Sequence, residues 1–113
     1  MNYASTNIPT ADAAKYILKL CRHFAHKVQA DFTEREGRVQ FLQGQCVMKG
    51  DVSALCVYLQ AATADGIQSM QFIIDDHLQR FVRFETLSYQ WGTEMPQTIQ
   101  RELEAIAQTG SAT

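Results

Sequence analysis

Four short stretches of alternating apolar and polar residues follow one another through the middle of the chain. They lie at residues 29–33, 38–42, 45–49 and 55–59, and Gly37, Gly44 and Gly50 stand in the breaks between them. Alternation with a period of two is typical of strands that bury one face, and glycine in short polar breaks is typical of tight turns. The spacing therefore predicts a four-stranded antiparallel meander with one buried face.

Helical periodicity appears on both sides of this meander, at residues 11–26 and 64–81. Thr10 and Thr63 stand at the N-cap positions, and an aspartate follows each of them in the first turn. The first helix is predicted to bury a stripe formed by Ala14, Ile17, Leu18, Cys21, Ala25 and Val28, with Leu20 and Phe24 on its flank. The second is predicted to bury Ile67, Met70, Ile74, Leu78 and Phe81.

Two further strands are predicted outside these helices, at residues 2–8 and 85–91. In the second of them Leu87, Tyr89 and Trp91 would share one side. The resulting order is strand, helix, four strands, helix, strand. This order is typical of an α+β fold in which two helices cover one face of an antiparallel sheet.

The last part of the chain predicts an extra C-terminal helix. Pro96 suits a first helical position, Ile99, Leu103 and Ile106 form a narrow apolar stripe, and Gly110 would end the helix. A helix of this length needs a partner surface. We therefore expect one α+β domain at residues 1–92 and a helical tail at residues 93–113, which docks on its own domain or across a dimer.

Composition narrows the functional classes. The formal net charge of −2 argues against nucleic acid as the main partner. The three cysteines, Cys21, Cys46 and Cys56, have no close pair spacing, which is typical of reduced, mostly buried thiols and leaves a redox role for Cys46 or Cys56 open. The chain shows neither a secretory signal nor an apolar run of the ~20 residues that a membrane span requires. We expect a cytoplasmic protein.

The most distinctive stretch for chemistry is residues 20–27, Leu-Cys-Arg-His-Phe-Ala-His-Lys. His23 and His26 would lie about 60° apart around a helix, so they could share a metal ion with His77, the remaining histidine. Cys21 would lie ~200° from His23, within the core stripe. The alternative is that His23 and His26 bind nothing and that His77 is a boundary residue bonded to a backbone carbonyl.

Cations accompany these histidines. Together with Lys15 and Arg83, the cations near these histidines form a group that could attract phosphate or carboxylate ligands. The candidate ligand-binding residues are Lys19, Arg22, His23, His26, Lys27 and Arg80. The alternative is a solvated helix face whose cations lie near the C-terminus, where the helix dipole favours them. The sequence contains no glycine-rich phosphate loop, nucleophile elbow or carboxylate pair, so we expect no catalysis from this chain alone.

Residues 20–27, together with Phe41, the run Gly44-Gln-Cys46, the run His77-Leu-Gln-Arg-Phe81 and Trp91, resemble a family of small bacterial proteins, domain of unknown function 2218. The resemblance covers residues 2–91. It implies a fold like that of the TATA-binding protein, with a curved antiparallel sheet under two helices. It also implies a link to siderophore-interacting flavoproteins, beside or fused to which relatives occur and which release iron from its chelators. The residues it marks for handling iron, haem or a ferric chelate are Cys21, His23, His26, Lys27, Cys46, His77 and Arg80.

Together these observations predict a small cytoplasmic binding or accessory module of bacterial iron metabolism. Iron, zinc and haem are the candidate cofactors. A ferric chelate or a siderophore-interacting flavoprotein is the candidate partner, and the C-terminal helix is a candidate homodimer contact. The alternative is a structural or protein-interaction domain without a metal or small-molecule ligand, in which a partner protein contacts the basic face or the tail helix.

Overall fold

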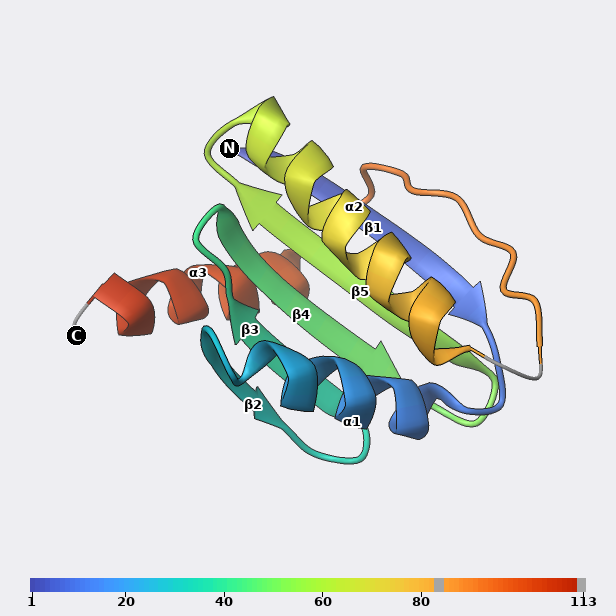
Figure 1. The fold of residues 1–113 in the computed structure, drawn as a ribbon. Helices are drawn as coiled ribbons and strands as arrows, with labels where there is room; N and C mark the ends of the chain where they lie inside the picture. The colour runs from blue at the N-terminus through green and yellow to red at the C-terminus, as the bar shows by residue number, and fades with distance from the viewer. Residues whose placement is uncertain (83–84, 112–113) are drawn as a thin grey trace.

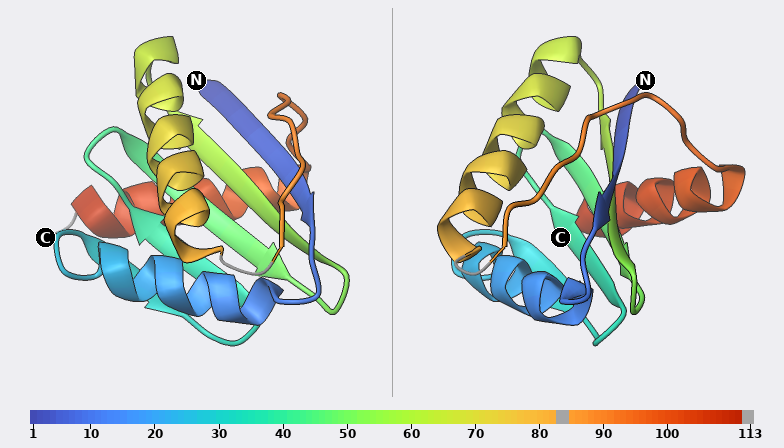
Figure 2. Two further views of the ribbon diagram at one scale, coloured as in Figure 1. Left: turned by 45° about the vertical axis from the view of Figure 1, so that its right-hand side comes forward. Right: turned by 90° about the vertical axis from the view of Figure 1, so that its right-hand side faces the viewer.

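The computed structural model describes residues 1–82 and 85–111. A five-stranded antiparallel sheet lies at its centre, in the order β1-β5-β4-β3-β2 (Figure 1). The strands are β1 (Asn2–Pro9), β2 (Gln29–Phe32), β3 (Glu36–Gln40), β4 (Gly44–Gly50) and β5 (Ala54–Ala61). Helices α1 (Ala13–Phe24) and α2 (Ala64–Phe81) cover one face, and α3 (Gln97–Ser111) crosses the other (Figure 2). The predicted α+β class and the antiparallel meander are confirmed.

The main core lies between the sheet and the two covering helices. Leu55, Val57 and Leu59 of β5 are completely buried there, and so are Cys46 and Met48 of β4. Their alternation with outward-facing residues is the one that the sequence predicts, so the predicted inward side of β4 and β5 is confirmed. No helix within the described residues is long and apolar enough to cross a membrane.

Helix α2 also follows its prediction. The hydroxyl oxygen of Thr63 accepts a hydrogen bond from the backbone N–H of Gly66 at 3.0 Å, as an N-cap residue does. Ile67, Met70, Ile74 and Leu78 of the predicted stripe are buried against the sheet. Phe81, its last residue, is only half-buried and packs at the margin of the core.

Helix α1 begins later than predicted, because Asp12 rather than Thr10 occupies its N-cap position. Thr10 instead accepts a hydrogen bond from the backbone of Asp12 and donates one to the Glu85 carboxylate at 3.1 Å. The Thr10 hydroxyl thus connects the start of α1 to the segment that follows α2.

The buried face of α1 is also rotated from the predicted one. Ala13 and Tyr16 are buried, whereas Ala14 and Ala25 of the predicted stripe are exposed. The predicted Ile17, Leu20, Cys21 and Phe24 are buried, and Leu18 and Val28 are half-buried. Tyr16 can be buried because its hydroxyl donates to Glu85 at 2.6 Å. Burial and this carboxylate raise the pKa of Tyr16 to about 12.

The predicted strand at residues 85–91 is wrong. Among the residues that the structure describes, backbone pairing between this part of the chain and the β1 edge is limited to Ser5 and Gly92, which exchange hydrogen bonds of 2.9 and 2.7 Å. The segment runs beside β1 (Figure 2), but side chains hold it. Tyr89 Oη and Trp91 Nε1 both donate to the Asp75 carboxylate of α2, at 2.6 and 3.0 Å. The predicted inward side of this segment is nevertheless correct, since Leu87, Tyr89 and Trp91 pack on the core.

We expect Asp75→Ala to loosen this segment, because the substitution leaves the hydroxyl of Tyr89 and the indole of Trp91 without their acceptor. Hydrogen bonds to charged groups contribute roughly 1.5–3 kcal/mol, so the free energy of unfolding should fall by about 2 kcal/mol. Trp91 is the single tryptophan, so its emission should shift to the red while the protein remains folded. Asp76→Ala is the control, because Asp76 forms an ion pair with Arg80 at the surface. Unchanged stability and emission in Asp75→Ala would contradict this role.

Helix α3 docks on the sheet of its own domain, one of the two arrangements predicted for the tail. Ile99 and Leu103 are buried against Val47 of β4, and Met95 and Ile106 pack at the margin. The helix continues through Gly110 to Ser111, so the predicted stop at Gly110 is wrong.

Candidate functional site

Two of the three histidines meet where the C-terminal part of α2 approaches α1 (Figure 1). His23 comes from the last turn of α1 and His77 from the last third of α2, and their ring centroids are 4.4 Å apart. Phe24 lies 5.2 Å from His77 and Phe81 lies 6.2 Å from His23, again between ring centroids. The pair is therefore bordered by aromatic rings, while the exposed ring of His23 keeps it accessible.

The tautomer of His77 follows from its hydrogen bond. Its Nδ1 lies 2.7 Å from the carbonyl oxygen of Ile73, and because a carbonyl only accepts, Nδ1 must carry the proton and donate. This is the bond to a backbone carbonyl that the alternative prediction gave for His77. It also leaves the lone pair of Nε2 free in the neutral ring. Metal-binding histidines typically donate their second nitrogen in this way.

The surroundings of His23 keep its imidazole neutral. Partial burial lowers the pKa of His23, and His77, His26, Lys27 and Arg80 lower it further by repelling a positive charge. Each of these neighbours is a cation or can become one. The histidine pair thus combines a neutral nitrogen ligand at pH 7 with a positive environment.

The predicted cations lie on the outer side of α1 and in the turn that follows it. Arg22, His26 and Lys27 are exposed and Lys19 is half-buried. Within the described part of the chain, no acidic group lies within ion-pair distance of Lys19, Arg22 or Lys27. Arg80 is paired with Asp76 at 3.2 Å. Arg83 lies outside the described residues.

The structure does not assemble the predicted three-histidine site. No group of three His, Cys, Asp or Glu side chains that could hold a metal ion is found in residues 1–82 and 85–111. His23 and His77 are in ring contact, whereas His26 contacts neither ring. The structure thus joins two of the three predicted metal ligands, across two helices.

The cysteines differ from this histidine pair because two of the three are completely buried. Burial raises the pKa of Cys21 to about 11 and holds that of Cys46 well above its usual value. Because the thiolate is the reactive form, burial argues against a redox role for Cys46. Cys56 faces the opposite side of the sheet, where the Asn7 side-chain amide donates to its sulfur at 3.4 Å.

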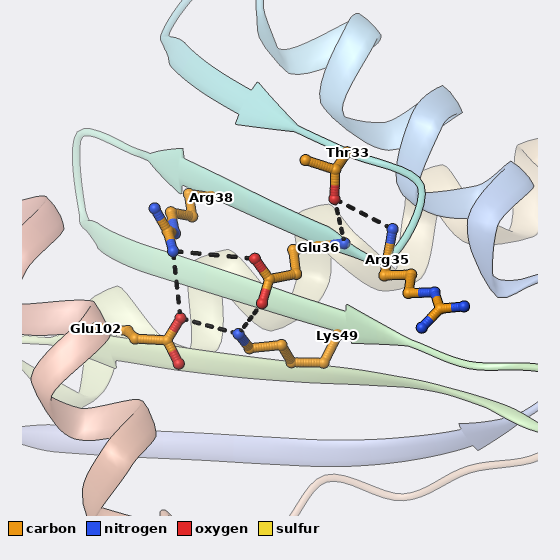
Figure 3. Close-up of polar contacts among 6 residues, drawn as sticks. All are labelled: Thr33, Arg35, Glu36, Arg38, Lys49 and Glu102. Carbon is orange, nitrogen blue, oxygen red and sulfur yellow. Dashed lines mark hydrogen bonds and ion pairs between the residues drawn. The ribbon is translucent and has the colours of Figure 1, made fainter.

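A second polar cluster, which the sequence analysis missed, lies under α3 (Figure 3). The Lys49 ammonium group donates to Glu36 and to Glu102, the latter at 2.9 Å. The Arg38 guanidinium lies 3.9 Å from Glu36 and 3.6 Å from Glu102. The hydrogen bond from Lys49 lowers the pKa of Glu36. The charges of β3 and β4 could be assigned to one face from their alternation, but the sequence does not show where Glu102 of α3 would meet them.

Beside this cluster, Thr33 shapes the turn that leads into β3. Its hydroxyl oxygen accepts hydrogen bonds from the backbone N–H groups of Arg35 and Glu36, both at 3.2 Å (Figure 3). This turn places Glu36 at the start of β3, beside Lys49 of β4.

Comparison with known proteins finds a matching family and solved structures of similar fold. Residues 5–92 match the family described as "Uncharacterized protein conserved in bacteria (DUF2218)". The NMR structure of PA4090 from Pseudomonas aeruginosa is 28% identical, with a TM-score of 0.71, and the match covers 84% of this chain and 100% of that chain. No curated protein matches the chain. The family match ends before α3 begins.

Proposed function

The chain belongs to the bacterial family DUF2218, and we propose that it is a cytoplasmic binding or accessory module for an anionic metal chelate. The observation that carries the proposal is the contact between His23 and His77, whose ring centroids are 4.4 Å apart. His77 is oriented by Ile73 with Nε2 free, and His23 stays neutral at pH 7. In this proposal one metal ion would take a nitrogen ligand from each of the two rings.

Two protein ligands favour a chelated metal over a bare ion. Protein sites for zinc usually provide three or four ligands, and imidazole also suits iron, copper and nickel. At the His23–His77 pair a chelator would have to supply the remaining ligands. Arg22 and Lys27 have no acidic partner within residues 1–82 and 85–111 and would attract its negative charge. The resemblance to proteins linked with siderophore-interacting flavoproteins makes a ferric chelate the first candidate, with such a flavoprotein as partner and zinc or haem as further candidates.

We expect the protein to bind ferric citrate in equilibrium dialysis, and His23→Ala combined with His77→Ala to weaken binding at least tenfold. His26→Ala is the matched control, because His26 contacts neither ring, and it should bind within about threefold of the wild type. Affinity should fall as the pH decreases through the lowered pKa of His23, because a proton then competes with the metal for the ring nitrogen.

An affinity that rises as the pH decreases would show simple anion attraction, since protonated histidines bind an anion more tightly. That result, or equal binding by the wild type and the double variant, would refute the chelate site. Iron-free citrate is the second control, because it tests whether the cations alone hold the ligand.

A second candidate function is protein interaction through the outer face of α1. Lys15, Lys19 and Arg22 are spaced at helical intervals on α1, and His26 follows in the turn after it. The structure shows no acidic partner for any of them in the residues it describes. An acidic surface of a partner protein would complement this face. A pull-down with wild type and Lys19→Glu/Arg22→Glu protein tests it, and light scattering on the same samples tests the homodimer predicted through the C-terminal helix.

A further inference from the structure

A cleft of about 280 Å³ opens between the β2 edge of the sheet and α3, on the face opposite the histidine pair. Gln29 and Asp31 of β2, Arg38 of β3, and Glu102 and Ile106 of α3 line it. Ligand pockets for drug-sized molecules occupy about 300–1,000 Å³, so this cleft has the size for a small metabolite. Its lining combines both signs of charge with an apolar side chain.

Asp31 and Arg38 are direct neighbours across the β2–β3 pair, yet they do not form an ion pair. The strand register places them opposite each other, where opposite charges usually interact. In the described residues, however, the ion pairs of Arg38 are those with Glu36 and Glu102, at 3.9 and 3.6 Å (Figure 3). These distances exceed hydrogen-bond length. The guanidinium therefore lies near two carboxylates, but its N–H groups donate no hydrogen bond within the described part of the chain.

Charge decides which ligand suits the cleft. Asp31 and Glu102 would repel a ligand that carries only negative charge, and Arg38 would repel a simple amine. A zwitterion avoids both kinds of repulsion. Its carboxylate can pair with the Arg38 guanidinium through two hydrogen bonds, and its ammonium group can donate to the Asp31 carboxylate. Cross-strand neighbours have Cβ atoms about 5 Å apart, so both can reach groups on one ligand carbon.

We infer that this cleft binds a free α-amino acid with an apolar side chain. The ligand carboxylate lies on Arg38, its ammonium group on Asp31, and its side chain against Ile106. This site is independent of the histidine pair, since the two lie on opposite faces of the sheet.

The test is a titration of ¹⁵N-labelled full-length protein with L-leucine, followed by amide chemical shifts. We expect shifts confined to β2, β3 and α3, with a dissociation constant on the order of 1 mM for a small, partly open site. Leucine amide lacks the carboxylate and N-acetylleucine lacks the ammonium group, so each should bind at least tenfold more weakly. Shifts that map to α1 and α2, or equal binding by all three compounds, would overturn the inference.

Two variants test the assigned contacts. Asp31→Asn and Arg38→Gln should each weaken leucine binding at least tenfold, whereas Arg101→Gln and Glu104→Gln, exposed on α3 outside the cleft, should bind as the wild type does. Arg38→Gln also removes a contact to α3, so Asp31→Asn, which lies outside the ion-pair cluster, is the decisive variant. Unchanged leucine affinity in Asp31→Asn, or no leucine shifts in the wild type at about ten times the expected constant, would refute the site.

Discussion

Gly44→Ala should abolish stable folding or lower the free energy of unfolding by about 4 kcal/mol or more, a size reached by few single substitutions. An added Cβ at this position would lie 2.0 Å from the backbone oxygen of Gln60. That oxygen belongs to β5, where Gly44 pairs with Ala61. Backbone atoms in a paired strand cannot move aside as a flexible side chain can. Relief of the clash would require β4 and β5 to separate.

Urea denaturation followed by circular dichroism measures this effect. Gly92→Ala is the matched control, because the nearest atom to its added Cβ is the Ser5 carbonyl oxygen at 3.9 Å, an ordinary contact. Gly37→Ala should fall between the two, since its Cβ would meet the Cys21 sulfur at 2.8 Å and that side chain can adjust. A Gly44→Ala protein with the wild-type midpoint would show that the two strands are less tightly paired than the structure indicates.

The meander could be predicted because successive positions of its strands repeat one pattern, in which inward and outward residues alternate. Leu55, Val57 and Leu59 alternate with outward residues, and a shift of one residue would expose all three. The buried face of α1 was harder to predict. Tyr16 can be buried because Glu85 accepts a hydrogen bond from its hydroxyl, and this partner is 69 residues away in sequence. The periodicity of the helix alone therefore favoured Ala14 and Ala25.

The segment at residues 85–91 shows a second limit of periodicity. Its alternation predicts which side chains face the core but not what holds the backbone. Thr6 donates its hydroxyl to the carbonyl of Gln90 at 2.8 Å, and Asp75 holds Tyr89 and Trp91. These side-chain bonds replace a strand ladder, and local sequence carries no sign of them.

The candidate site has the same dependence on tertiary structure. Helical spacing predicts that His23 and His26 lie close together, because only three positions separate them. The observed partner of His23 is His77, and that contact requires the C-terminal part of α2 to approach α1. The residue types of the site could be predicted, whereas their pairing depends on how the helices pack.

Leu103→Ala should release α3 from the sheet while the main core stays folded. Leu103 is completely buried, but it belongs to a small second cluster with Val47 and Ile99, separate from the main core. Buried Leu→Ala changes typically cost about 2–5 kcal/mol, and this contact is the centre of the α3 interface. We therefore expect faster hydrogen exchange and proteolysis within residues 93–111, with main-core protection retained. Glu104→Ala, on the exposed side of α3, is the control.

Deletion of residues 93–113 extends the same test. It should lower the melting temperature, because Val47 and Tyr58 lose their apolar cover. The remaining domain should still fold, because the main core lies between the sheet and α1 and α2 and includes no residue of α3. An unchanged melting temperature after deletion and after Leu103→Ala would show that α3 contributes nothing to stability, contrary to its buried face.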